Sequence, residues 1–227
     1  MPDLGKVLLS ISYLPNIQYF SKLLCYIQPI IEVNDTYQKQ SYRNRATILG
    51  ANGTLDLVIP VKRPNGNTTK TCDVLIDYDT PWQPTHWKAI VSAYKNSPFF
   101  DIFEPELKPF FRKKTKFLVF RKKTKFLVDW DIKLMNALME MTATEIVLKK
   151  TFDYVKEPNS EIDDFRESIH PKKRMQKSDT AFIPLPYFQV FNYKFGYIPN
   201  LSFIDLLFNE GPQAIYLCKK MMMKKGN

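Results

Sequence analysis

The order of apolar and polar positions divides the chain into a strand-rich first half and a more helical second half. Residues 6–14 form an apolar, partly β-branched run that is typical of a buried strand. After Pro15, apolar side chains recur at helical spacing over residues 16–27, and residues 30–33 are strand-like again. This order predicts a parallel strand pair, because parallel strands need a crossover connection such as a helix.

Two Asn-Gly pairs, at residues 52–53 and 65–66, separate the β-rich runs that follow. Asn-Gly is the strongest short signal for a hairpin, so residues 45–78 predict a three-stranded antiparallel meander. Residues 144–154 have the pattern of a further strand. Helices are predicted near residues 84–96, 129–141 and 202–209, and from about residue 212. The expected fold class is α/β or α+β, with a strand–helix–strand opening, an antiparallel β-meander and a more helical C-terminal half.

The chain length suits one compact unit, made of an α/β part with the meander at residues 1–100 and a mainly helical part at residues 101–227. Residues 157–180 are polar, charged and without apolar periodicity. Loops of this length are usually functional or disordered, so we expect a long mobile loop there.

The phrase FRKKTKFLV occurs twice in succession, at residues 111–119 and 120–128. A helix turns about 100° per residue, so nine residues rotate the copy by about half a turn. A strand also reverses its face over an odd number of residues. Since a repeat that builds one binding surface keeps its face, we interpret the second copy as a tandem duplication. A selected basic patch that binds nucleic acid is the alternative.

Composition narrows the class of ligand. The formal net charge is +10, and each copy of the repeat carries four of the positive charges. The remaining excess suits an anionic ligand such as a nucleotide or a phosphosugar, and nucleic acid is not required. The three cysteines are widely spaced, which argues against a disulfide framework. Since there is no signal-peptide pattern and no run of 18 apolar residues, we expect a cytoplasmic protein without a membrane span.

The familiar catalytic and cofactor motifs are missing from the sequence. The seven glycines form neither a dinucleotide-binding fingerprint nor a P-loop, and no G-x-S-x-G phrase occurs. With two histidines in the chain, a multi-histidine metal site is not expected. We therefore expect neither a metal ion nor a cofactor.

Five phrases form a combination that is more specific than any one of them: YLPNIQYF, YQKQSYRNR, IPVK, WQPTHWKAIVSAYKNSPFF and FGYIPNLSFIDLLFNEGP. With these phrases, spread over residues 13–212, the chain resembles the WbqC family. The resemblance implies a bacterial source and a role in making O-antigen or a related surface polysaccharide, without a particular reaction. The family has one FRKKTKFL-like phrase before the helix at residues 129–141, which supports the duplication.

The densest polar phrase is YQKQSYRNR at residues 37–45. Its arginines offer forked donors for phosphate, and its tyrosines offer flat rings for a base or a sugar. A solvated connection before the meander is the alternative, and the family resemblance favours the anion site. The substrate-binding candidates here are Tyr37, Lys39, Tyr42, Arg43, Asn44 and Arg45, and of these Arg43 and Arg45 are the expected phosphate ligands.

Two histidines are the candidate proton acceptors. His86 lies in the first turn of an expected helix, where the helix dipole lowers a histidine pKa and leaves a neutral imidazole. Trp82 and Gln83 in the same phrase are candidate substrate contacts, and a packing or capping histidine is the alternative. His170 lies with Arg166 in the long polar segment, as part of a closing lid or as an ordinary loop histidine.

The phrase GYIPNLSFIDLLFNEGP adds three candidates, Asn200, Asp205 and Glu210. Asn200 is expected to cap the helix that begins near Ser202, and Asp205 lies in the first turns of that helix. Glu210 is placed at a helix stop or facing a pocket. A structural role is the alternative for all three.

Three functions are compatible with these features. The first is an enzyme of surface glycan synthesis that binds a nucleotide-linked or phosphorylated sugar and transfers an acyl or aminoacyl group to it, with His86 as the base. The second is a non-catalytic protein partner in a glycan-assembly complex. The third, and least favoured, is nucleic-acid binding through the repeated basic stretch.

Overall fold

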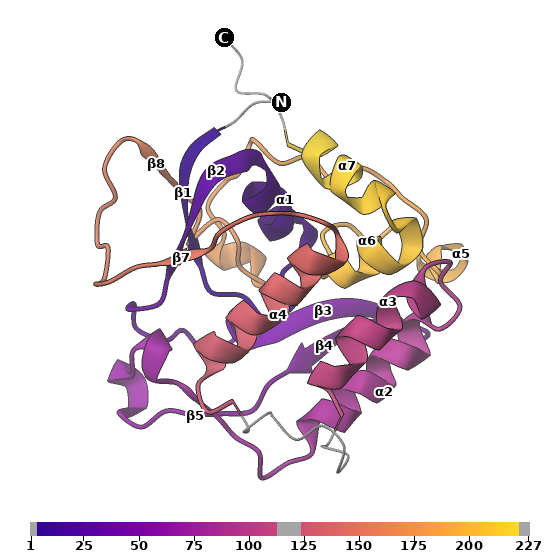
Figure 1. Ribbon diagram of the computed structural model, residues 1–227, viewed down its shortest axis with the longest axis horizontal. Coiled ribbons are helices and arrows are strands. Elements are labelled where there is room, and N and C mark those ends of the chain that lie inside the picture. The colour runs from indigo at the N-terminus through magenta and orange to yellow at the C-terminus, as the bar shows by residue number, and fades with distance from the viewer. Residues whose placement is uncertain (1–3, 113–123, 223–227) are drawn as a thin grey trace.

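The computed structural model describes residues 4–112 and 124–222, and it shows a mixed α/β fold around a parallel sheet (Figure 1). The chain opens with two parallel strands joined by a helix, which confirms the predicted opening. The Asn16 side-chain oxygen begins the helix by accepting a hydrogen bond from the backbone N–H of Tyr19 at 2.9 Å. The elements of this opening are β1 (Leu4–Ser10), α1 (Ile17–Cys25) and β2 (Tyr26–Glu32).

Two short strands from much later in the chain complete this sheet. They are β7 (Lys149–Lys150) and β8 (Ile162–Asp164), and the order in the sheet is β7-β2-β1-β8. Every pairing in it is parallel, so the carboxyl ends of all four strands meet at one edge. β7 lies within the strand predicted at residues 144–154, and β8 lies within the segment expected to be a long loop.

The predicted meander is divided into two separate antiparallel pairs. Asn52-Gly53 forms the turn of the first hairpin, as expected. The second pair begins after Pro60, which has no backbone N–H to donate to a continuing ladder. The strands are β3 (Arg45–Gly50), β4 (Gly53–Val58), β5 (Val61–Lys62) and β6 (Leu75–Ile76).

The helices predicted near residues 84–96, 129–141 and 202–209 and from about residue 212 are present. The helices after α1 are α2 (Trp82–Tyr94), α3 (Phe100–Leu107), α4 (Leu127–Met141), α5 (Asn192–Phe195), α6 (Phe203–Glu210) and α7 (Gln213–Lys220). Short 3-10 turns lie at Gly66–Thr68, Thr71–Asp73, Lys108–Phe110 and Lys173–Met175. No helix in the described parts of the chain is long and apolar enough to cross a membrane.

One apolar core connects these elements. α1 packs against α6 and α7, α2 packs against β3, and α4 packs against α3 and the turn at Thr71–Asp73. The core includes buried residues from both predicted parts of the chain, residues 1–100 and 101–227. The later strands and helices therefore cover apolar side chains of the first part.

Most of the nine-residue repeat, residues 113–123, lies outside the described residues, and the prediction of a tandem duplication rests on the sequence. Its two ends are described. Phe111, from the first copy, is buried against the ring of Trp87. Leu127 and Val128 end the second copy and form the first turn of α4.

Candidate functional site

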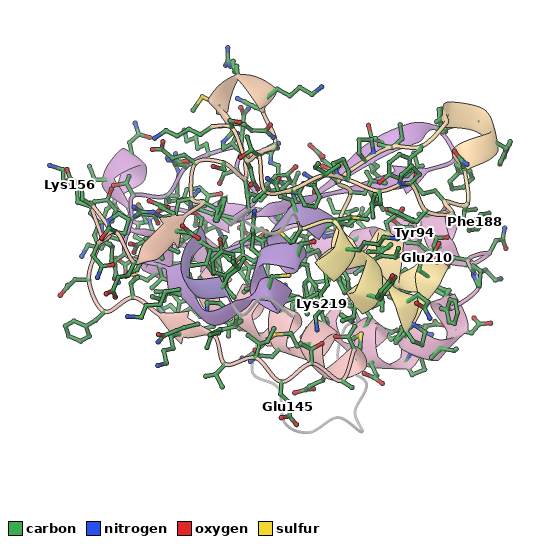
Figure 2. All side chains as sticks on the ribbon, turned by 90° about the horizontal axis from the view of Figure 1, so that it is seen from above. Tyr94, Glu145, Lys156, Phe188, Glu210 and Lys219 are labelled. Carbon is green, nitrogen blue, oxygen red and sulfur yellow. The ribbon has the colours of Figure 1, made fainter. Side chains whose placement is uncertain are left out.

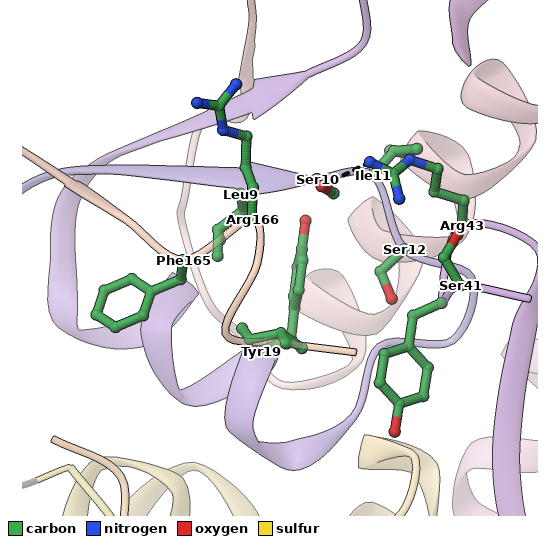
Figure 3. Close-up of a pocket in the computed structure, with 11 residues that line it drawn as sticks. Leu9, Ser10, Ile11, Ser12, Tyr19, Ser41, Arg43, Phe165 and Arg166 are labelled. Atoms are coloured by element: carbon green, nitrogen blue, oxygen red, sulfur yellow. Dashed lines mark hydrogen bonds between the residues drawn. The ribbon is translucent and has the colours of Figure 1, made fainter. Parts of the chain in front are cut away.

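A small pocket lies at the carboxyl edge of the parallel sheet, between the ends of β1 and β8 (Figure 3). Ligands of open α/β sheets bind at this edge, where the strand order reverses. Here β1 connects to β2 on one side, while β8 returns to its other side. The lining residues are Leu9, Ser10, Ile11, Ser12, Tyr19, Ser41, Tyr42, Arg43, Phe165, Arg166 and Ile169.

Arg43 is the central cation of this pocket and is 4% exposed. Its Nη2 atom donates to Ser10 Oγ at 3.0 Å and to the Asp35 carboxylate, and its Nη1 atom donates to Gln38 Oε1 at 3.4 Å. Asp35 is held in turn by the Thr71 hydroxyl, which donates to it at 2.6 Å. The guanidinium is therefore fixed in position at the end of β1, as a pre-organised ligand group must be.

Three buried polar atoms at this pocket have no hydrogen-bond partner in the described chain: Ser12 Oγ, Tyr19 OH and Arg43 Nε. All three residues line the pocket, and Figure 3 shows the Tyr19 hydroxyl directed toward Ser10 and the end of Arg43. An unpaired buried donor or acceptor costs about 1–3 kcal/mol. Three such atoms at one place indicate that something outside the chain, water or a ligand, completes their bonding.

Burial dominates the pKa values of the tyrosines of this region, and nearby charges modify them. Burial raises the pKa of Tyr19, repulsion by Asp131 adds to the rise, and Arg43 opposes it. Burial likewise raises the pKa of Tyr37 to about 12, with Arg43 lowering it and Asp131 raising it. Both hydroxyls therefore stay protonated at neutral pH and can donate hydrogen bonds.

The outer wall of the pocket is the segment after β8, residues 165–170, which we call the cover segment. Its Arg166 donates to the buried carboxylate of Glu32 at 3.4 Å, to Asp164 and to the Val155 carbonyl. The Phe165 ring lies 3.9 Å from the ammonium of the buried Lys22. These contacts hold the cover segment over the ends of the strands.

His170 ends the cover segment and lies close to the predicted arginines. Burial lowers its pKa, and the positive charges of Arg43, Lys172 and Arg45 lower it further. Its Nδ1 atom accepts a hydrogen bond from the backbone N–H of Lys172 at 3.0 Å. His170 thus lies near Arg43 and Arg45, and Arg166 precedes it in the cover segment; its role as part of a lid stays a prediction.

The pocket is small. Its free space is about 10 Å³, which is room for about one water molecule. A ligand with a phosphate group needs more space, so the cover segment would have to move outward before such a ligand enters. The part of the wall formed by β1 and the segment at residues 41–43 is anchored by the Arg43 contacts and stays as a fixed floor.

The rest of the predicted polar phrase takes mainly structural positions. Tyr37 is buried, and Lys39 is exposed at the surface. Tyr42 lines the pocket. The Asn44 side chain donates to the Ile59 carbonyl at 2.8 Å, which ties it to the chain beyond β4. Arg45 lies at the start of β3, 3.6 Å from the Asp56 carboxylate.

His86 lies in the core and does not line the pocket. Its Nδ1 atom is 2.9 Å from the hydroxyl of Tyr13, and both side chains are buried. Burial lowers the pKa of His86 to about 4, and a hydrogen bond with the backbone of Val58 offsets part of that change. Burial, and not the helix dipole that the sequence suggested, therefore keeps the imidazole neutral at neutral pH, and Tyr13 occupies one of its nitrogens.

The two candidates that precede His86 are also engaged in packing. The Trp82 ring lies 5.2 Å from the His86 ring and 5.3 Å from that of Trp130. Gln83 donates to the carbonyl of Phe110 at 2.8 Å. Neither residue lines the pocket at the sheet edge.

The three C-terminal candidates lie apart from this pocket. Asn200 does not cap the helix that follows it. Instead its side-chain oxygen accepts from the backbone N–H of Gln18 at 2.9 Å, in the first turn of α1. The cap prediction is wrong because α6 begins at Phe203, which puts Asn200 two residues before the N-cap position. Ser202 occupies the N-cap position of α6.

Asp205 and Glu210 belong to the packing around α6. Asp205 is buried and accepts hydrogen bonds from Tyr94 and Tyr187. Glu210 accepts from the backbone N–H of Phe188 at 3.1 Å. Figure 2 shows Tyr94, Phe188 and Glu210 on the same side of the molecule.

Sequence reasoning missed Ser12, Tyr19 and the buried Asp131 of α4. Ser12 and Tyr19 lie in an apolar opening that looks like ordinary core. Asp131 carried a readable signal, since it shares a helix face with Leu127, Leu134 and Leu138 at spacings of three and four. A carboxylate on an otherwise apolar face is expensive and therefore informative.

The fold and the pocket together define an open-sheet α/β protein with a polar site at the carboxyl edge of its parallel strands. Within that class, the chain belongs to the WbqC-like protein family, whose model matches residues 12–216. An uncharacterized protein of Mycobacterium tuberculosis, Rv1507c, is 24% identical over 224 residues, covering 89% of this chain and 92% of its own length. No solved structure matches the chain significantly.

Proposed function

We propose that this protein binds a nucleotide-linked or phosphorylated sugar at the carboxyl edge of its parallel sheet, and that it acts in the synthesis of a bacterial surface polysaccharide. The observation that carries the binding proposal is the convergence of three unpartnered buried groups, Ser12 Oγ, Tyr19 OH and Arg43 Nε, on one pocket. The place in polysaccharide synthesis rests on the resemblance to the WbqC family.

The chemistry of the pocket favours an anionic group. Arg43 presents a planar, permanently charged donor, and its unpartnered Nε–H can donate one charge-assisted hydrogen bond to a phosphate oxygen. Asp35 already neutralises one side of this guanidinium, so its free Nε supplies a hydrogen bond rather than an uncompensated charge. The Ser12 and Tyr19 hydroxyls supply two further donors. Such a site holds one phosphate by hydrogen bonds and does not need a polyanion.

Entry of the ligand requires the cover segment to open. Arg166 then exchanges some of its present acceptors for the ligand, and His170 moves with it. Because the pairing of Arg166 with Glu32 is buried, opening costs energy that the ligand must repay. The proposal therefore includes a lid that closes over the bound phosphate.

Transfer of an acyl or aminoacyl group to a sugar amine is the reaction that we propose for the site. His86 is neutral and would act through the Tyr13 hydroxyl, since Tyr13 directly follows Ser12 and bonds to the imidazole. In that arrangement His86 is a positioning residue behind the pocket. His86→Gln is then expected to lower turnover and to leave ligand affinity unchanged.

A non-catalytic role in a glycan-assembly complex is the second candidate. The observation that favours it is a group of exposed apolar side chains around β7, where Val147 is 78% exposed and Phe152 is 95% exposed. Nucleic-acid binding is less favoured, because the nine-residue offset turns the second copy of the basic repeat to the opposite face in a helix or in a strand.

The test is a thermal-shift titration with inorganic phosphate, UDP, glucose 1-phosphate and UDP-glucose. A ligand that binds the folded state raises the melting temperature by mass action. We expect a phosphorylated sugar to raise the melting temperature of the unaltered protein. The Arg43→Lys variant, which keeps the positive charge but lacks the guanidinium group, should lose most of that rise. Arg112→Lys, at an exposed arginine, is the matched control. No rise with any of the four compounds would overturn the proposal.

A further inference from the structure

A groove much larger than the candidate pocket lies near the opposite edge of the parallel sheet. Its volume is about 650 Å³, within the range of roughly 300–1,000 Å³ that small-molecule sites occupy. Leu24 lines the groove from the last turn of α1, where the chain enters β2. Because β1 and β2 are parallel, α1 leads from the carboxyl end of β1 back to the amino end of β2. The groove is therefore a separate site from the pocket.

The floor of the groove is apolar and lies where several helices meet. Phe103 of α3 and Leu207 of α6 are buried, while Leu24 of α1, Met141 of α4 and Ile215 of α7 are half-buried. Four of these five side chains are flexible or branched chains without a ring. Such a surface adapts to an alkyl chain and buries its methylene groups.

One face of α7 forms the length of the groove. Pro212, Ile215 and Lys219 all line it, and their spacing of three and four residues places them on one side of the helix. At a rise of 1.5 Å per residue, the stretch from Pro212 to Lys219 spans about 10 Å. Residues 142–146, which follow α4 on the way to β7, form a further part of the wall (Figure 1). The groove is therefore long enough for an extended chain of medium length.

Two charged side chains line the groove, and their positions differ. Glu145 is exposed, and Figure 2 shows it at the outer edge of the molecule. Lys219 is half-buried, and no carboxylate of residues 4–112 and 124–222 forms an ion pair with it. The inner charge of the groove is thus a free ammonium beside apolar side chains. This arrangement is complementary to an alkyl chain that ends in one negative charge.

We infer that this groove binds an aliphatic carboxylic acid of medium chain length, with the chain on the apolar floor and the carboxylate paired with Lys219. The inference goes beyond the proposed function and does not depend on it. Each methylene group that the floor buries raises the affinity by up to about fourfold. The pairing of the carboxylate with the ammonium is a charge-assisted hydrogen bond, which an uncharged ligand lacks.

Calorimetric titrations of the full chain with decanoate, 1-decanol and butyrate test both parts of the inference. Decanol keeps the chain without the charge, and butyrate keeps the charge with a shorter chain. We expect decanoate to bind at least about tenfold more tightly than either of the others. This comparison uses the unaltered protein, so it does not depend on the folding of a variant.

The role of the ammonium is tested with Lys219→Met, which removes the charge and keeps an unbranched side chain. Lys220→Met, at the exposed neighbouring lysine, is the matched control. We expect Lys219→Met to weaken decanoate about tenfold and to leave decanol within about twofold, while Lys220→Met changes neither.

The role of the floor is tested with Ile215→Gln, which places a polar group in the middle of the groove. Its control is Tyr216→Gln, at a residue that is 58% exposed and does not line the groove. We expect Ile215→Gln to weaken decanoate and decanol alike by about fivefold, and the control to leave both within about twofold.

Three results would overturn the inference. They are no binding of decanoate by the unaltered protein below the concentration at which decanoate aggregates, equal affinity of butyrate and decanoate, and equal affinity of Lys219→Met and Lys220→Met for decanoate. None of them bears on the proposed function, whose ligands are phosphorylated. Conversely, Arg43→Lys should bind decanoate as the unaltered protein does, because Arg43 lines the pocket and not the groove.

Discussion

Two buried aspartates in two regions of the molecule, Asp205 and Asp131, differ in whether the chain supplies hydrogen-bond donors to their carboxyl groups. Asp205 of α6 is 1% exposed and Asp131 of α4 is 0% exposed. Asp205 accepts hydrogen bonds from Tyr187 at 2.6 Å, Tyr94 at 3.0 Å and Gln189 at 3.2 Å. Asp131 accepts none from the described residues.

The difference separates a carboxyl that the chain supplies with hydrogen-bond donors from one that has no donor among the described residues. Burial raises the pKa of both carboxyls, but the three donors bring that of Asp205 back to about 6. No donor opposes the rise at Asp131. Where a buried carboxyl holds the fold together, the chain supplies its partners. Asp131 has no such partner among the described residues, so hydrogen bonds within them do not offset the cost of its burial.

The largest effect is expected for Asp205→Leu. It removes the shared acceptor of Tyr94, Tyr187 and Gln189 and leaves buried donors unpaired, so the free energy of unfolding should fall by about 5 kcal/mol. Urea denaturation measures this change. If Asp205→Leu changed the free energy of unfolding no more unfavourably than Asp131→Leu, the contrast between the two aspartates would be wrong.

The substitution Gly211→Ala tests how tightly the side chains around the end of α6 are packed. Gly211 follows α6 with φ 53°, and a Cβ there would lie 2.4 Å from Cδ1 of Phe99. Strain and overlap together should lower the free energy of unfolding by about 3 kcal/mol. Gly53→Ala is the control, since Gly53 also has a positive φ of 107° but no atom within 4 Å of a new Cβ. We expect the control to lose about 1 kcal/mol.

The dependence of stability on pH should distinguish the two aspartates. An acid whose pKa is higher in the folded state than in the unfolded state binds extra protons on folding, so stability falls as pH rises. Asp205, with a pKa raised from 3.8 to about 6, should lose about 3 kcal/mol of stability between pH 4 and pH 6 and no more above that. The loss from Asp131 should continue beyond pH 6.

Denaturation of the unaltered protein, Asp205→Asn and Asp131→Leu across this pH range isolates the two contributions as differences. The stability advantage of Asp131→Leu should keep growing above pH 6. A plateau at pH 6 for both variants would mean that Asp131 has partners comparable to those of Asp205.

At a fixed neutral pH, Asp131→Leu should raise the free energy of unfolding by about 2 kcal/mol, because it removes an unpaired buried polar group from an apolar face. Asp129→Leu, on the exposed face of the same helix, should change it by less than about 0.5 kcal/mol. A destabilised Asp131→Leu would show that the carboxyl supports the fold.

The opening of the fold could be predicted because its signals are local. The apolar run of β1, the spacing within α1 and the cap at Asn16 all lie within about 30 residues. β8 could not be predicted in the same way. Its sequence Ile162–Asp164 has one apolar residue, and it is a strand because the open edge of β1 gives it a partner. Pro60 can be read from the sequence. That the chain divides there into two separate strand pairs depends on the path of the residues that follow, which the sequence does not show.

The site was predictable in its charged residues and not in its neutral ones. Arg43, Arg166 and His170 stood out from the sequence and lie together in the structure. Ser12 and Tyr19 resemble core residues until their hydroxyls are found without partners. His86 and Asp205 had the right chemistry for a site, but tertiary contacts with tyrosines occupy both of them.

The most direct test of the central claim uses two tyrosines, one from each region. Tyr19 OH is unpaired beside the pocket, and Tyr187 OH donates to Asp205. Titration of UDP-glucose and glucose 1-phosphate into Tyr19→Phe and Tyr187→Phe, with a urea melt of each, gives affinity and stability together. The account predicts that Tyr19→Phe keeps its stability and loses about tenfold in affinity, whereas Tyr187→Phe loses about 1.5 kcal/mol of stability and keeps its affinity. Unchanged affinity in Tyr19→Phe would contradict it.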